Sequence, residues 1–420
     1  MKLNSWSAIG SLVAISFAVT LAEIPSSTWF STATLSLGAG VSALTLMGAA
    51  ALLGGRLSFV EALFGGLDRV YVTHKHLGVF ALALASFHLT FKAGAEGWST
   101  ASILTLPPYY TRLVRQLSFV ALMVIVMLAL NRKIPYSAWR WWHKLSGPLF
   151  VIVVLHWLSF KSPIVLASPA GAWLAAWSTL GVGAAAYKLL LYPFLSSHAL
   201  YRVVSVMPGQ AGMHLVMAPV KHPIAFMPGQ FGFLSMKEDG LREPHPFTIA
   251  SAGETGEEAH FVIRDLGDYT HKLLQRTTVG MFANIYAPFG RFGRIESARE
   301  VWIAGGVGIS PFIAWLSDGA ARGFEKVTLF YFYTPGREFP SAKALEELAR
   351  QRGAEFVSVS GGPNSTVFAQ RFAAIAKSSG PANVNVSFCG PEGLMSRVKS
   401  AMRDNEVPDA NLRYEYFDFR

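Results

Sequence analysis

Residues 73–88 read THKHLGVFALALASFH, an apolar stretch with histidines at both ends. Hydrocarbon offers an imidazole neither a hydrogen-bond partner nor a metal, so histidines in a membrane span need a local reason. His74 and His88 are 14 residues apart, which separates them by about 20 Å along a helix and returns within about 40° of the same face. His76, 12 residues before His88, is a competing choice for the first position.

A matching pair lies in the apolar stretch 141–161, where His143 and His156 are 13 residues apart. On an ideal helix these two side chains would miss a common face by about 140°. Gly147-Pro148 lies between them, and proline kinks or rewinds a helix, which offers a remedy. Helix-end histidines that snorkel to the interface are the plainer interpretation. Two matched pairs instead favour two haems, one above the other, each held between one histidine from either helix.

Six apolar runs precede a more polar half of the chain. Each is close to the ~20 residues that an α-helix needs to cross the hydrocarbon core. They lie at roughly 6–23, 31–53, 71–91, 113–131, 141–161 and 171–193. Lys2 before the first run leaves a cleaved signal peptide as an alternative there, although no clear small-x-small cleavage site with a polar mature start follows.

Charge also separates the two halves. Residues 1–201 hold 13 Lys and Arg against 4 Asp and Glu, a net charge of +9, whereas residues 202–420 hold 23 against 22. A basic apolar half is typical of membrane topology signals, so no nucleic-acid partner is expected. Basic residues gather in the connections after the second and fourth runs, which predicts a multi-pass protein of the cell (inner) membrane with both termini cytoplasmic. Lys92, Arg112 and Arg115, after the third run, depart from this pattern.

After Pro193 the pattern becomes that of a folded soluble protein. Short alternating runs such as HLVMA and HFVIR, divided by Gly and Pro turns, predict a small antiparallel barrel. Farther on, strands such as VTLFYFY alternate with helical patterns such as AKALEELARQR, which predicts a parallel α/β sheet. The predicted domains are a membrane all-α six-helix bundle over 1–198, an antiparallel β-barrel over 199–297 and an α/β parallel-sheet domain over 298–420.

Motifs in the barrel segment suit a flavin. A flavin needs a hydrogen-bonding group near its N5, a flat apolar wall and backbone N–H groups for its pyrophosphate. HPFT (245–248) offers Thr248 and Phe247 for the first two needs, and FVIRDLGDYTHKL (261–273) offers a glycine turn for the third. Each is ordinary when taken alone, but their order before YAPFGRFG favours FAD. The candidate FAD contacts are His245, Pro246, Phe247, Thr248, Arg264, Gly267, Tyr269 and Thr270.

Two glycine motifs suit a nicotinamide nucleotide. AGGVGISPF (304–312) follows the strand VWIA and opens a helix, where phosphates approach backbone donors. SFCGPEGLM (387–395) places Cys389, the only cysteine, at the end of a later strand, where parallel sheets bind ligands; a small core residue is the alternative. Arg337 suits a 2′-phosphate, or is an exposed loop arginine, so NAD(P)H is the expected substrate. The candidate contacts are Gly305, Gly306, Gly308, Ser310, Pro311, Arg337, Cys389, Gly390 and Pro391.

Together with the histidine pairs, HPFT, GDYT, GGVGISPF, CGPEG and the terminal YEYFDFR, the whole chain resembles a bacterial member of the NADPH oxidase/ferric reductase superfamily. The resemblance implies a ferric-reductase-type membrane domain fused to a ferredoxin-reductase-type dehydrogenase. It pairs His74 with His143 at an inner b-type haem and His88 with His156 at an outer one. His245 stands where soluble relatives have an arginine.

The resemblance also implies catalytic residues at the flavin. An aromatic near the C-terminus covers the flavin ring in relatives, and it joins Thr248 and Cys389 as a candidate catalytic residue. Phe417 fits that position best, and the residues beyond it leave Phe419 as an alternative.

The implied activity is that of an NAD(P)H oxidase or ferric reductase. Cytosolic NAD(P)H would deliver electrons through FAD and two b-type haems to an acceptor on the far side of the lipid bilayer. Dioxygen giving superoxide is the first choice of acceptor, with a ferric chelate or a periplasmic or membrane redox partner as alternatives. Homo-oligomerisation is left open. The non-enzymatic alternative is a six-helix transporter with a regulatory nucleotide domain, which a haem spectrum would exclude.

Overall fold

A computed structural model describes the chain except for residues 1–2, 132, 254–257, 361, 363 and 416–420. The chain divides into two compact units, one that ends at Leu195 and one that begins at Ser196. Each unit is described by itself.

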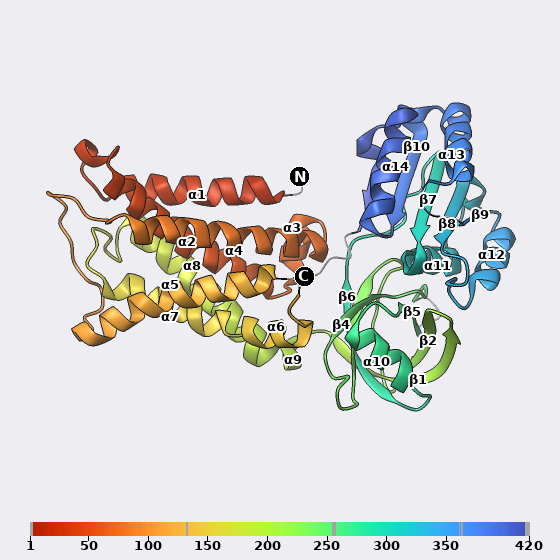
Figure 1. The fold of residues 1–420 in the computed structure, drawn as a ribbon, viewed down its shortest axis with the longest axis horizontal. Helices are drawn as coiled ribbons and strands as arrows, with labels where there is room; N and C mark the ends of the chain where they lie inside the picture. Colours follow the sequence, from red (N-terminus) through yellow and green to blue (C-terminus); the bar gives the residue numbers. More distant parts are fainter. Residues whose placement is uncertain (1–2, 132, 254–257, 361, 363, 416–420) are drawn as a thin grey trace. The chain divides into compact units, whose positions relative to one another are not determined.

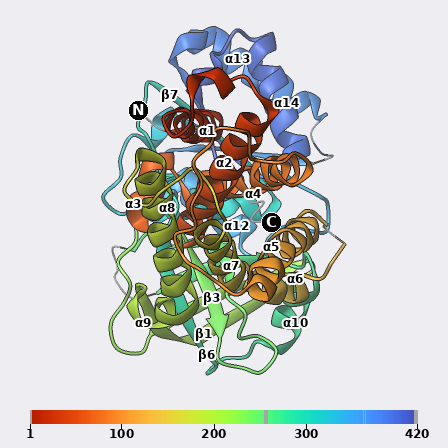
Figure 2. The same ribbon diagram turned by 90° about the vertical axis from the view of Figure 1, so that its left-hand side faces the viewer.

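The first unit is all helical (Figure 1). Its α-helices are α1 Ser5–Leu21, α2 Thr32–Gly54, α3 Ser58–Phe64, α4 Leu67–Thr90, α5 Pro108–Leu130, α6 Tyr136–His143, α7 Ser146–Ser159, α8 Pro169–Ala186 and α9 Tyr192–Leu195. A 3₁₀ turn covers Ser26–Thr28, and the π-helix Tyr187–Leu191 joins α8 to α9. Helix α2 packs most extensively against α4, α8 and α1, and Figure 2 shows it among them.

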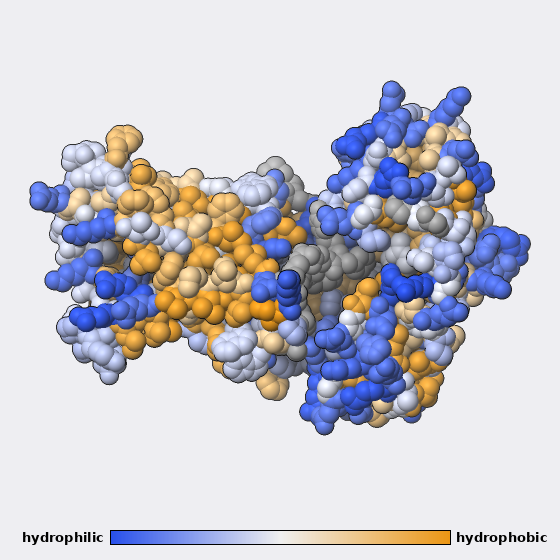
Figure 3. Space-filling view, in the orientation of Figure 1, coloured by the Kyte–Doolittle hydropathy of each residue, from blue (hydrophilic) through white to orange (hydrophobic). Residues whose placement is uncertain are grey.

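Three described helical stretches are long and apolar enough to cross a membrane: Thr32–Gly54, Pro108–Leu128 and Pro169–Leu195. Helix α1 is apolar but shorter, and α4 is long but carries Asp68, Arg69 and Lys75. Apolar side chains cover much of the visible face of this unit (Figure 3). On α5, Leu117, Val120, Val124 and Met127 are exposed, as lipid-facing residues would be.

The expected helix over 141–161 differs from the structure. Helix α6 ends at His143 and α7 begins at Ser146, so the helix is interrupted between the two histidines of this stretch. Pro148 lies in the first turn of α7, where its missing N–H costs nothing. Because of this interruption, the angle between His143 and His156 is no longer the one that a single continuous helix would impose on their side chains.

The second unit begins with an antiparallel sheet in the strand order β4-β3-β6-β1-β2-β5. The strands are β1 His198–Gly209, β2 Gly212–Pro219, β3 Phe231–Met236, β4 His245–Thr248, β5 Ala259–Arg264 and β6 Phe282–Phe289, with α10 Asp268–Arg276 after β5. A bridge between Ile249 and Phe261 joins the two edges of the sheet, which nearly closes it into a barrel. Alternate side chains such as Tyr201, Leu215 and Phe261 fill the interior.

A parallel sheet follows, in the order β11-β10-β7-β8-β9. Its strands are β7 Arg299–Gly305, β8 Val327–Tyr333, β9 Glu355–Ser360, β10 Val384–Cys389 and β11 Leu412–Tyr414. The helices are α11 Ser310–Ser317, α12 Ala342–Gln351, α13 Thr366–Ser379 and α14 Glu392–Asp404, with 3₁₀ turns at Gly306–Ile309, Phe324–Lys326, Pro381–Asn383 and Asp409–Asn411. Read from β9, this is the doubly wound order of dinucleotide-binding folds, whose crevice lies where the order reverses, between β7 and β10.

Both faces of this sheet are covered by helices (Figure 1). Trp302 on β7 packs with Phe312 and Trp315 of α11 on one face. Val301 and Ile303, next to it on the same strand, pack with residues of α13 and α14 on the other face. Burial on both faces explains why β7 and β8 read as nearly continuous apolar runs.

Candidate functional site

In the first unit, a backbone carbonyl orients two of the histidines of α4, His74 and His88. Nδ1 of His74 lies 2.8 Å from the carbonyl oxygen of Ala50, and Nδ1 of His88 lies 2.8 Å from that of Ser36. Both carbonyls belong to α2. A carbonyl acceptor on Nδ1 fixes the tautomer that carries its proton there, which leaves the Nε2 lone pair for a ligand.

The second pair of histidines faces the first. The rings of His74 and His143 are 5.9 Å apart between centroids at an interplanar angle of 76°. Those of His88 and His156 are 6.4 Å apart at 84°. The structure thus brings together the same partners that the resemblance implied.

The second histidine of each pair has an aromatic neighbour four residues away. Trp139 stacks on His143 at 5.2 Å and 18°, and Phe160 packs on His156 at 4.6 Å. Nδ1 of His143 and of His156 is buried and has no hydrogen-bond partner among the described residues. Sequence analysis missed these aromatic neighbours, although their spacing of four residues was visible.

The geometry fits a haem iron between each pair. Two imidazole–metal bonds of roughly 2 Å, with about 1 Å from each nitrogen to its ring centre, predict a centroid separation of about 6 Å. The observed 5.9 and 6.4 Å agree. Among the described residues no group of three or more His, Cys, Asp or Glu could hold a metal. A haem requires only two, because the porphyrin supplies the other four ligands.

Other residues of the same helices lie elsewhere. His76 stacks on Trp6 of α1 at 5.2 Å, so it faces away from the histidine pairs. Lys92 is exposed just beyond α4. The guanidinium of Arg115, on α5, lies 5.9 Å from the ring centre of Phe160, which places it beside the outer pair.

In the barrel, β4 carries HPFT along one edge of the sheet, with Thr248 opposite Phe231 of β3. The Thr248 hydroxyl is buried and lacks a hydrogen-bond partner within the described part of the chain. A buried hydroxyl without a partner costs stability, so it calls for a ligand. Phe247 and Pro246 are half-buried on the same strand. This arrangement fits a flavin that takes a hydrogen bond from Thr248.

His245 stacks on Tyr269 of α10 with 3.6 Å between ring centres and an angle of 20°. Burial, and then the Glu243 carboxylate, raise the pKa of Tyr269, whose protonated hydroxyl donates to the carbonyl of Leu241. The HPFT and GDYT motifs are therefore joined through one ring pair.

The loop before α10 is held by Thr270. Its hydroxyl accepts hydrogen bonds from the backbone N–H groups of Leu266 and Gly267. Gly267 has an extended φ of 168°, so no left-handed backbone requires glycine there. Arg264, at the end of β5, lies beside the glycine loop: a Cβ on Gly306 would meet its Nη1 at 3.5 Å. Arg264 therefore lies between the barrel motifs proposed for FAD and the glycine loop proposed for the nicotinamide nucleotide.

The two glycine motifs meet at the carboxyl ends of β7 and β10. Cys389 pairs with Ala304, and a Cβ on Gly308 would lie 2.1 Å from the Cys389 carbonyl. A Cβ on Gly305 would lie 2.6 Å from Pro391 and 3.3 Å from Gly390. Only glycine permits this approach, at the switch point where doubly wound sheets bind nucleotides.

Cys389 itself is fully buried. Burial first, and then Glu415, raise the pKa of its thiol well above the ordinary range, so it stays protonated and is no thiolate nucleophile. Sequence analysis did not single out Glu415, a buried carboxylate whose Oε1 lies 2.8 Å from where a Cβ on Gly290 would be. Its place in the terminal YEYFDFR motif was the available signal.

The remaining candidates differ in setting. Ser310 and Pro311 are buried at the start of α11, and the Ser310 hydroxyl donates to the carbonyl of Val307. Arg337 is exposed in the turn after β8. Phe417 and its alternative Phe419 lie outside the described residues.

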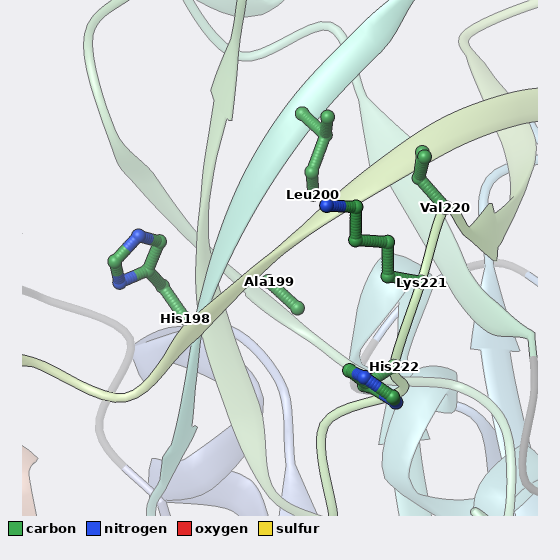
Figure 4. A pocket seen from close by; sticks show the side chains of 6 residues that line it. All are labelled: His198, Ala199, Leu200, Val220, Lys221 and His222. Carbon is green, nitrogen blue, oxygen red and sulfur yellow. The ribbon is translucent and has the colours of Figure 1, made fainter.

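A separate pocket of about 240 Å³ opens on the barrel surface (Figure 4). It is lined by His198, Ala199, Leu200, Val220, Lys221 and His222. None of the residues that the sequence singled out lines it.

Two protein families match the chain. A ferric reductase like transmembrane component matches residues 39–154, and an FAD-binding domain matches residues 199–288. The chain is 25% identical over 332 residues to a probable cell surface ferric reductase of Aspergillus oryzae, covering 71% of this chain and 43% of that protein.

Other relatives match the second half. The toluate 1,2-dioxygenase electron transfer component of Pseudomonas putida is 27% identical and covers 46% of this chain and 59% of its own length. The ferredoxin–NAD(+) reductase component of the alkene monooxygenase system of Xanthobacter autotrophicus is 31% identical, covering 37% of this chain and 47% of that protein. The chain spans about half the length of the curated relatives it matches.

The fold and the comparisons together describe a chain with helices apolar enough to cross a membrane, a segment similar to a ferric reductase like transmembrane component and a segment similar to an FAD-binding domain. The order of these similarities resembles a fusion of the ferric reductase/NADPH oxidase type, in which a ferric-reductase-like transmembrane component precedes an FAD-binding domain and a ferredoxin-reductase-like segment.

Proposed function

We propose that this protein transfers electrons from cytosolic NAD(P)H, by way of FAD and two b-type haems, to an acceptor across the membrane. Dioxygen giving superoxide is the acceptor proposed first; one NAD(P)H then reduces two dioxygen molecules by one electron each. The observation that carries the proposal is the pairing of His74 with His143 and of His88 with His156 at separations that suit iron ligation. FAD, when bound, supplies the conversion of a two-electron hydride into single electrons, which the haem irons carry on.

The roles of the chain's own residues follow from their positions. Thr248 offers a hydrogen bond to the flavin, and Pro246 and Phe247 border the ring. The glycines at the ends of β7 and β10 let a nucleotide approach the backbone, with Cys389 packed beneath it as a neutral thiol. Arg264 lies where it can neutralise phosphate charge. Phe417 is proposed to cover the flavin, and Arg337 to favour a 2′-phosphate.

The proposed organisation has six membrane spans over 1–198, an FAD domain over 199–297 and an NAD(P)H domain over 298–420. In this proposal both termini and the dehydrogenase lie on the cytoplasmic side of the cell (inner) membrane, which the basic residues of the connections favour. The long α4 serves as a span in this proposal despite its charges, because they lie toward its N-terminal half.

The experiment that tests the function is NADPH oxidation by the purified protein, in air and without oxygen. Superoxide dismutase-sensitive reduction of a superoxide probe supports dioxygen as acceptor. Oxidation sustained by ferric citrate without oxygen favours the ferric-chelate alternative. Flavin and haem reduction with no turnover on either acceptor favours a redox partner protein.

A further inference from the structure

Helix α2 presents two carbonyls to His74 and His88 of α4, and the carbonyls have the same spacing as these two histidines. His74 and His88 are 14 residues apart, and the carbonyls that they contact, on Ala50 and Ser36, are also 14 residues apart. The two helices therefore run antiparallel in matched register at both histidines. Each carbonyl lies 2.8 Å from an imidazole Nδ1.

At each of these contacts α2 has a glycine, so no side chain of α2 stands between the carbonyl and the imidazole. In an α-helix the residue four positions later stands directly beyond a carbonyl. For Ser36 that residue is Gly40, and for Ala50 it is Gly54. A Cβ on Gly40 would lie 2.8 Å from Nδ1 of His88 and within 3.0 Å of two more ring atoms. A Cβ on Gly54 would lie 3.7 Å from Cε1 of His74, an ordinary contact.

We propose that Gly40 and Gly54 are positioning residues, two notches in α2 that admit the α4 imidazoles to helix carbonyls and so set the orientation and donor strength of one axial ligand per haem. This inference rests on the proposed haem ligation. The outer notch, at Gly40, is closed to any side chain, whereas the inner notch at Gly54 has room for a methyl group.

The two ligands of each haem are then unequal. Hydrogen bonding from Nδ1–H to a carbonyl makes an imidazole a stronger donor and stabilises ferric over ferrous iron. His74 and His88 have such an acceptor, and within the described chain Nδ1 of His143 and of His156 has none. Loss of a notch should therefore raise the midpoint potential of the haem beside it.

The test compares full-length variants purified in detergent, by haem content, low-temperature EPR and redox titration. Gly40→Ala should shift the EPR signal and raise the potential of one haem, or release that haem, and leave the other unchanged. The affected haem should be the one lost in His156→Ala. Gly54→Ala should leave both unchanged, and Gly54→Val should shift only the other haem. Gly78→Ala on α4 is the matched control, because nothing lies within 4 Å of a Cβ there.

Alanine is the better helix former, so an effect of Gly40→Ala cannot come from helix propensity. Wild-type signals and potentials in Gly40→Ala overturn the inference, as does an equal shift of both haems. Should Gly40→Ala fail to assemble, Gly54→Val decides: a shift confined to the inner haem supports the notches, and an unchanged inner haem overturns them.

Pulsed EPR of the wild type gives an answer without any variant. It should resolve two classes of remote histidine nitrogen, one hydrogen-bonded and one not, and a single class overturns the inference. A wild type without any bis-histidine haem spectrum refutes the haem assignment and the inference together. Normal haem spectra with an unaffected Gly40→Ala refute the inference alone.

Discussion

Thr248 combines deep burial with a hydroxyl that no described residue satisfies. If this hydroxyl holds the flavin, Thr248→Ala should slow flavin reduction by NADPH about tenfold to a hundredfold, the effect of losing one hydrogen bond of about 1.4–2.7 kcal/mol. Stopped-flow absorbance of the flavin measures the rate. Thr248→Ser keeps the hydroxyl and should stay near the wild-type rate. Equal rates in all three proteins would remove Thr248 from the flavin site.

His214, on β2, is the residue whose titration should affect stability. Burial first, and then the neighbouring His260, lower the pKa of His214 to about 4, and its Nδ1 lies 3.0 Å from the Ser341 hydroxyl. The unfolded chain binds a proton from about pH 6.5 downward, which the folded chain does not bind until about pH 4. Stability should therefore fall as pH falls through this window.

Thermal unfolding of the second unit within the full-length protein, at neutral pH and at about pH 5, measures this effect. His214→Gln should reduce the loss of stability at the lower pH, because the buried ring no longer titrates. His222→Gln, at an exposed position on the barrel, should retain the full loss. An identical pH dependence in all three proteins would assign the effect to other groups.

At the scale of elements, the segment after β6 is fixed to β7 by a buried ion pair. Arg294 makes two hydrogen bonds to Glu300, of 3.0 and 2.9 Å, and the two side chains are only 8% and 3% exposed. Arg294→Leu leaves the carboxylate buried without its charge partner, which should cost about 3–5 kcal/mol of unfolding free energy. Denaturant unfolding checks this value. Arg350→Leu, which breaks an exposed pair with Glu347, should change little, and a comparable loss there would contradict the argument.

Helix α5 brings a cation, Arg115, close to the pair of His88 and His156. Arg115 lies over Phe160, which packs on His156, whereas Lys92 is exposed beyond the end of α4. Arg115→Met should therefore raise the apparent KM for an anionic ferric chelate, or slow the final electron transfer, more than Lys92→Met does, because a nearby cation stabilises developing negative charge. Steady-state kinetics with dioxygen and with ferric citrate as acceptors compare the two variants. A larger effect of Lys92→Met would mean that Lys92, and not Arg115, is the cation that stabilises the developing negative charge.

At the scale of the whole molecule, the chain forms two compact units, so the proposed flavin reduction can be tested apart from the proposed membrane steps. The double variant His88→Ala/His156→Ala should lose about one of two haems and stop reduction of external acceptors. Its flavin should still be reduced by NADPH at the wild-type rate. The pyridine haemochrome assay measures the haem content, and anaerobic stopped-flow spectra measure the rate of flavin reduction. Two haems retained in the double variant would contradict the pairing.

Much of this organisation was predictable from the sequence, because hydrophobic periodicity and glycine turns are local properties. The apolar runs, the barrel strands and the alternating α/β pattern all depend on neighbouring residues. The motifs HPFT and GGVGISPF and the spacing of His74 and His88 can likewise be read from one local stretch of the sequence.

Tertiary structure alone decided the contacts between distant segments. The sequence offered a kink near Gly147-Pro148 between His143 and His156, and the structure interrupts the helix just before it, at Lys144 and Leu145. The carbonyls of Ser36 and Ala50 carry no signal of residue type, since every residue has one. Glu415 becomes a neighbour of Cys389 only when β10 and the chain's end are packed together. Such environments depend on which segments pack against each other, and a linear pattern does not contain that information.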